Sequence, residues 1–211
     1  MANYCTFAQV IAEAPGSSLA STDTSTDFEA AVDSIIPSAS RAIDEEVGGW
    51  PDMFSPTTDD TTRYFDGSGE VEQDIDFLIS LTSVSVAEEG GTSSTDYTAW
   101  TLDTDFYVWP YSYDQISQPI QRLVIDFNGN QLSWGTYRKS VQVTGVFGWS
   151  ATPPADIVRA CIIQSVRWYM RAKQYYQQLA AGATVGTLNI TPGLDADIRE
   201  LLIPYQVRSM R

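Results

Sequence analysis

One long helical stretch, residues 153–181, constrains the fold more than any other part of the chain. Pro153 and Pro154 suit the first turn of a helix, where the missing backbone N–H costs nothing, and Thr152 can cap that turn. At about 1.5 Å per residue the stretch forms a helix of roughly 43 Å. Several neighbours are needed to cover a helix of this length, so we expect it to lie at the centre of a helical core.

The periodicity of this stretch predicts which face is buried. At about 3.6 residues per turn, its polar residues share one narrow face and its apolar residues cover more than half of the circumference. The narrow face comprises Ala160, Gln164, Arg167, Arg171, Gln174 and Gln178. The expected buried face comprises Val158, Ile162, Val166, Tyr169 and Tyr176, flanked by Cys161, Trp168 and Leu179. Such breadth predicts packing against an N-terminal helix and a β layer, and is compatible with contact to another copy of the chain.

The composition favours a folded protein without histidine chemistry. The 211 residues include 6 Trp, 11 Tyr and 8 Phe but no histidine, which removes the commonest general base and His-ligated metals. Cys5 and Cys161 are too few for a disulfide framework, so we expect two reduced, packed thiols. The chain begins without a signal-peptide pattern and has no apolar run of about 18 residues. We therefore expect synthesis inside the cell and no membrane partner.

The charge is unevenly distributed along the chain. The net charge is −15, yet residues 151–211 hold seven basic and four acidic groups, which leaves −18 on residues 1–150. An acidic body repels nucleic acid. Arg167 and Arg171, on the long helix, have two interpretations: a solvated helix surface, or a subunit interface with an acidic surface of a neighbouring copy.

The sequence predicts an α+β fold in four parts. Residues 1–49 form N-terminal helices of the core, 50–150 an inserted antiparallel β unit, 151–205 the long helix with a closing short helix, and 206–211 a C-terminal tail. The individual helices are expected at 6–14, at 27–47 with a kink or break at Pro37, and at 195–203.

Alternating apolar and β-branched residues predict the strands of the middle third. They are expected at 61–65, 76–86, 106–109, 121–127 and 140–147. Asn128-Gly129 is typical of a tight hairpin, which would join the fourth of these strands to another at 131–134.

Paired carboxylates leave one other function open. A glycosidase needs two carboxylates about 5–10 Å apart beside a cleft often lined by aromatic residues, and the segment 100–111 supplies such aromatics. The pairs are Asp59-Asp60, Asp74/Asp76, Glu88-Glu89 and Asp103/Asp105. Chance pairs are expected in so acidic a chain, so carbohydrate binding or cleavage is the alternative hypothesis. No segment matches a calcium loop or a phosphate-binding loop, so we expect neither a metal nor a cofactor.

Four segments and a closing helix carry a resemblance to a known family. They are I-P-S-A-S-R-A-I-D-E-E-V-G-G-W at 36–50, T-R-Y-F-D-G at 62–67, V-T-G-V-F-G-W at 143–149, P-A-D-I-V-R-A-C at 154–161 and D-A-D-I-R-E-L-L-I-P-Y at 195–205. In this order they resemble the head-to-tail connector, or head-completion adaptor, proteins of long-tailed phages. Pro37 departs from the pattern, because many relatives have an uninterrupted helix there.

The resemblance implies a non-enzymatic structural protein of the virion neck. Such adaptors form a ring, commonly twelve-fold, beneath the portal protein, and receive the next head-completion protein or the tail on the other side. Viral DNA passes through the ring without specific binding. Related adaptors reach the portal with their C-terminal segment, so the portal-interface candidates are Gln206, Val207, Arg208, Ser209, Met210 and Arg211. We expect this tail to be disordered until the portal orders it.

Overall fold

The structure is a computed structural model, which describes residues 2–13, 26–88, 96–180 and 193–207. It divides into two compact units: residues 1–52 together with 153–211 form a helical unit, and residues 53–152 form a β unit. Helices and an antiparallel sheet are both present, which confirms the α+β class.

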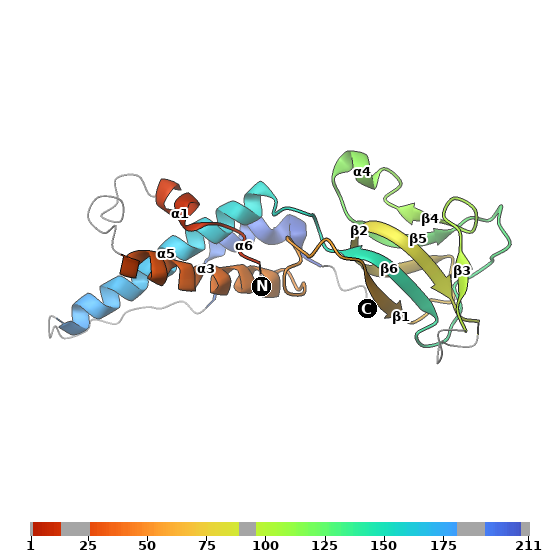
Figure 1. Cartoon of the computed structure of the whole chain (residues 1–211), viewed down its shortest axis with the longest axis horizontal. Helices are drawn as coiled ribbons and strands as arrows, with labels where there is room; N and C mark the ends of the chain where they lie inside the picture. The colour runs from red at the N-terminus through yellow and green to blue at the C-terminus, as the bar shows by residue number, and fades with distance from the viewer. Residues whose placement is uncertain (1, 14–25, 89–95, 181–192, 208–211) are drawn as a thin grey trace. The chain divides into compact units, whose positions relative to one another are not determined.

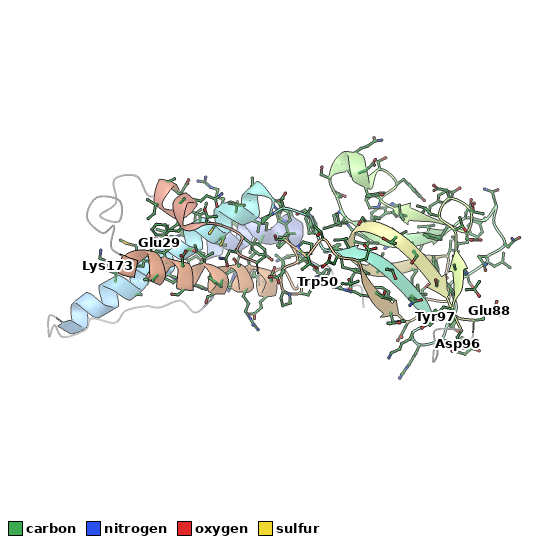
Figure 2. All side chains as sticks on the ribbon, viewed as in Figure 1. Glu29, Trp50, Glu88, Asp96, Tyr97 and Lys173 are labelled. Atoms are coloured by element: carbon green, nitrogen blue, oxygen red, sulfur yellow. The ribbon has the colours of Figure 1, made fainter. Side chains whose placement is uncertain are left out.

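The helical unit is built from both ends of the chain. It contains α1 (Phe7–Glu13), α3 (Thr26–Glu46), α5 (Ala155–Ala180) and α6 (Ala196–Leu202), followed by a 3-10 turn, η1 (Ile203–Tyr205). The two long helices, α3 and α5, pack against each other and run antiparallel (Figure 1). Accordingly Glu29, near the start of α3, and Lys173, near the end of α5, lie at the same end of the unit (Figure 2).

Local signals explain where the N-terminal helices begin and continue. Thr6 and Gln9 form a capping box at α1: the Gln9 N–H donates to Thr6 Oγ1 at 3.3 Å, and the Thr6 N–H donates to Gln9 Oε1 at 2.8 Å. The helix α3 continues through Pro37, so the predicted break is absent. Buried residues on both sides of the proline hold the helix in place; they are Val32, Ile36, Ala39 and Ile43.

The buried face of α5 differs from the face that its periodicity predicts. Ala160 and Gln164, expected on the solvated side, are fully buried together with Ile157 and Cys161. Ile162 is buried as predicted. The other expected core residues are only half-buried; they are Val158, Val166, Trp168 and Tyr169. The side chains of Gln174, Tyr176, Gln178 and Leu179 lie outside the described residues.

The packing of neighbouring helices explains why α5 buries this face and not the predicted one. Both α3 and α6 pack against α5, and the small side chain of Ala160 permits their close approach. Gln164 remains buried because its Oε1 accepts a hydrogen bond from the Asp195 N–H at 3.4 Å, which offsets part of the cost of removing the amide from water. The prediction that these two residues face solvent is therefore wrong.

The β unit is one antiparallel sheet with the strand order β1-β6-β2-β5-β4, and β3 pairs with β2. The strands are β1 (Thr61–Phe65), β2 (Glu72–Val86), β3 (Thr98–Trp100), β4 (Phe106–Trp109), β5 (Ile120–Ile125) and β6 (Val141–Phe147), and a one-turn helix α4 (Tyr113–Ile116) follows β4. The predicted bounds of β1 and β4 are correct. The strand β2 begins four residues before the predicted 76–86, because a bulge between Asp74 and Leu78 interrupts its alternation.

The predicted hairpin after β5 is wrong. Asp126 Oδ1 accepts hydrogen bonds from the backbone and side-chain N–H groups of Asn128, which makes a local turn, and residues 131–134 form no strand. Instead Trp134 is fully buried between Trp100 and Phe106, with ring centroids at 4.7 and 6.0 Å. Its indole N–H donates to the Val71 carbonyl at 3.0 Å, which satisfies the only polar atom of the ring.

The chain enters and leaves the β unit at adjacent points. The Trp149 N–H donates to the Met53 carbonyl at 2.7 Å, and the Trp149 ring contacts Phe77 edge-on at 4.8 Å. Gly148 permits this approach, since a Cβ at that position would lie 2.6 Å from Pro56 Cγ and 3.0 Å from the Met53 oxygen. Trp149 therefore fixes the exit of the sheet beside its entrance.

Candidate functional site

Arg167 and Arg171 belong to an ion-pair cluster with two aspartates of the same chain. Arg167 donates to both carboxylate oxygens of Asp197 at 2.6 and 2.7 Å, and to Asp195 at 3.0 Å. Arg171 donates from one nitrogen to both oxygens of Asp195, at 2.7 and 2.8 Å. We call these four residues the Arg–Asp cluster.

The cluster keeps both carboxylates charged. The hydrogen bond from Arg171 lowers the pKa of Asp195, and that from Arg167 lowers the pKa of Asp197. Asp195 is the more enclosed partner, with 15% of its side chain exposed against 55% for Asp197. The two positive and two negative charges balance each other, so the cluster presents no net charge to solvent.

The cluster also docks α6 onto α5. Asp195 is the N-cap residue of α6, in an extended backbone conformation. The helix behind it buries Ile198 and Leu202 completely. From the sequence, Arg167 and Arg171 are expected at a solvated surface or a subunit interface, and their pairing with these aspartates is not predicted. The spacing of Arg167 and Arg171, one helical turn apart, was the available signal.

The subunit-interface role of Arg167 and Arg171 stays a prediction. Their side chains are 37% and 32% exposed, so each retains a face that another chain can contact. The pairing inside the chain nevertheless changes the chemistry of that contact. A neighbour would meet a balanced, preordered cluster, not two free positive charges.

The C-terminal segment begins attached to the helical unit. The Val207 N–H donates to the Val47 carbonyl, one residue beyond α3, at 2.8 Å, and the Gln206 N–H donates to the Ile203 carbonyl at 3.4 Å. Tyr205 also donates its hydroxyl to Asp156 at 3.2 Å. Of the six portal-interface candidates, Gln206 and Val207 are thus held by the chain itself. Residues 208–211 lie outside the described residues.

Members of three carboxylate pairs of the β unit are bonded to other groups in the described structure. Asp74 accepts from Arg122 at 2.7 Å, and Asp76 accepts from Arg63 at 2.6 Å. Asp60 accepts from the Thr82 hydroxyl and Asp105 from the Thr101 N–H, each at 2.7 Å. Asp74 and Asp76 of β2 are therefore each held in an ion pair with an arginine of another strand. Residue 89 of the Glu88-Glu89 pair is not described.

The described residues hold neither a metal-ligand cluster nor a membrane-spanning helix. Across residues 2–13, 26–88, 96–180 and 193–207, no three Cys, Asp or Glu side chains gather in a way that could hold a metal ion. In the same ranges, every helix is too short or too polar to cross a membrane.

Comparison with known proteins yields distant structural neighbours. No protein-family model matches the sequence, and no curated protein matches it. A chain of the neck of an empty gene transfer agent (GTA) particle, computed with C6 symmetry, is 14% identical with a TM-score of 0.46, over 89% of this chain and 81% of that one. A chain of the native GTA virion is 13% identical with a TM-score of 0.48, over 88% and 84%. A chain of the native GTA neck, computed with C12 symmetry, is 13% identical with a TM-score of 0.46, over 85% and 83%. Similarities at this level do not establish a shared family.

Proposed function

We propose that this chain is a structural adaptor of a phage neck. In this proposal, copies of it form a ring beneath the portal and link the DNA-filled head to the next neck protein or to the tail. DNA passes through the ring, and the chain catalyses no reaction. The setting is the virion, at the interface of head and tail.

The observation that supports the proposal most is the arrangement of the chain. A helical core made from both chain ends, with an antiparallel β unit inserted between them, is the architecture that the sequence resemblance implies. The segments that carry the resemblance also hold that architecture together. Residues 143–149 contain most of β6 and the exit from the sheet, and residues 154–161 enter α5 and supply three of its buried residues, Ile157, Ala160 and Cys161.

The charge of the β unit fits a DNA channel better than a DNA-binding surface. Residues 53–152 contain four basic and fourteen acidic groups, a net charge of −10. Two of the four basic groups, Arg63 and Arg122, are already paired with carboxylates. Phosphate binding depends on unpaired Lys and Arg, so a wall of this composition would let DNA slide past.

A ring interface joins one surface of a subunit to a different surface of the next. We infer that one of these surfaces includes the exposed side of the Arg–Asp cluster. Residues 208–211, with Arg208 and Arg211, are the part of the chain best suited to reach the portal, since Val207 is already bonded to Val47.

Electron microscopy of the native particle tests the proposal directly. The expected result is density for several copies of this fold, arranged as a ring between the portal and the tail. A single copy per particle, or density elsewhere than the neck, contradicts it. The carbohydrate hypothesis is tested in parallel by retention on host polysaccharide, which the adaptor function does not predict.

A further inference from the structure

The two cysteines, which are 156 positions apart in the sequence, are neighbours in the core of the helical unit. Cys5 Sγ lies 3.1 Å from Cys161 Sγ, and both side chains are buried, at 2% and 0% exposure. Each is a free thiol, as the sequence predicts. Cys5 precedes α1 and Cys161 lies in the second turn of α5, so the pair joins the start of the chain to its central helix.

We propose that Cys5 and Cys161 form an intramolecular disulfide when the chain meets a peroxide, and that this bond fastens residues 2–6 to α5. The inference concerns a covalent modification of the core and does not depend on the neck function. A disulfide needs a sulfur–sulfur distance of about 2.05 Å, so the two atoms must approach by roughly 1 Å. Side-chain rotation on the short N-terminal segment can supply that movement.

The surroundings of the pair identify the sulfur that reacts first. Cys5 donates its S–H to Cys161, and this hydrogen bond lowers the pKa of Cys161. The Ser40 hydroxyl, 3.6 Å from Cys161 Sγ, lies beside the same sulfur. The Cys161 thiolate is therefore the nucleophile, and Cys5, whose pKa is raised by the same contact and by burial, is the resolving thiol.

The chemistry balances with hydrogen peroxide as the oxidant. The Cys161 thiolate attacks one peroxide oxygen, the O–O bond breaks, and Cys161 becomes a sulfenic acid while hydroxide leaves. The Cys5 sulfur then displaces the sulfenic oxygen to form the S–S bond. Over both steps two thiols lose two protons and two electrons, and the peroxide becomes two molecules of water.

Local opening of residues 2–6 gives the oxidant access to the buried sulfurs. The attachments of this segment to α3 and the residues after it include three hydrogen bonds: the Tyr4 N–H donates to Ser40 at 3.0 Å, the Tyr4 hydroxyl donates to Asp44, and the Ala2 N–H donates to Asp52. A segment of this length can open locally while the rest of the domain stays folded. Once the disulfide forms, the segment cannot leave α5.

Peptide mapping tests whether the bond forms. The reduced protein is treated with hydrogen peroxide, its remaining thiols are alkylated, and it is digested with trypsin without reductant. The expected product is one species that joins peptides 1–41 and 160–167 and lacks two hydrogens relative to their sum, without a covalent link between chains. Alkylation of both cysteines after the treatment, oxidation to sulfinic acids, or links between chains would each overturn the proposal.

Thermal melting tests whether the bond fastens the segment. Oxidised wild-type protein should melt about 5–15 °C higher than the same protein reduced, and dithiothreitol should reverse the shift. An unchanged or lower melting temperature contradicts the proposed role. The matched control is Cys5→Ser, which keeps a donor beside Cys161 and should show neither the joined peptides nor the shift. A shift of the same size in this variant would assign it to another oxidised residue.

Discussion

Two adjacent residues of α5 provide the sharpest test of how the helical core is packed. Ile157 is 0% exposed, whereas Val158 is half-buried, although the periodicity of the helix predicts Val158 for the core. Ile157→Ala removes three buried carbon groups, worth about 0.8 kcal/mol each in transfer free energy, and leaves a cavity that adds to the loss. Alanine returns about 0.4 kcal/mol through its helix propensity. The expected destabilisation is therefore about 3 kcal/mol.

Val158→Ala is the matched control, because it removes two carbon groups that are already partly in water. Its expected cost is about 0.5 kcal/mol after the same gain in helix propensity. Urea unfolding followed by far-ultraviolet circular dichroism reports on the helices. Ile157→Ala should lower the urea midpoint by about 1–2 M, and Val158→Ala by less than about 0.5 M. A larger effect at Val158 than at Ile157 would show that α5 presents a face rotated by about 100° to its neighbours.

Three further predictions concern charge and the chain end. Burial raises the pKa of Asp44 from 3.8 to about 6. The protonated carboxyl therefore contributes stability that is present below pH ~4 and is lost as the pH rises through 6. The stability of Asp44→Asn relative to wild type should rise by about 1–3 kcal/mol between pH 4 and 7 in urea titrations. Asp195→Ala should lower the free energy of unfolding by about 1–3 kcal/mol in the same assay, because two arginines lose an enclosed partner. Asp197→Ala, at the more exposed carboxylate, should lower it by less than about 1 kcal/mol, and equal losses would contradict this. Deleting residues 208–211 should leave the melting temperature unchanged and abolish co-sedimentation with DNA-filled heads. A deletion that includes Val207 should also lower the melting temperature, because it removes the hydrogen bond to Val47. Full binding to heads without residues 208–211 would refute the portal contact.

Much of the fold follows from local patterns in the sequence. The strands β1 and β4 and the long helix were predictable because each has a clear period and clear ends. The face of α5 was not predictable in the same way. Periodicity assigns Gln164 to solvent because it is polar, whereas the folded chain buries it against Asp195, a residue 31 positions later. Hydrogen bonds between distant segments leave no trace in a helical period.

Contacts between residues far apart in the sequence were also not predicted. Trp134 follows a strong hairpin signal, yet the burial of a whole indole ring between Trp100 and Phe106 outweighs the pairing of a short strand. The approach of Cys5 to Cys161 and the Arg–Asp cluster depend in the same way on how α1, α3, α5 and α6 pack. Residue types suggested the chemistry of these sites, and only the fold brought their members together.

In the sequence, the β unit lies between the two parts of the helical unit, and this order affects how the chain is synthesised. The ribosome completes α3 by Glu46, but the helix that covers it, α5, begins only at Ala155, after the 100 residues of the β unit. At ~5–20 residues per second, that interval lasts roughly 5–20 s. Throughout it, the apolar stripe of Val32, Ile36 and Ile43 has no partner from α5. The nascent chain therefore carries an uncovered helix while an entire sheet forms behind it, which makes α3 the segment on which a ribosome-associated chaperone would act.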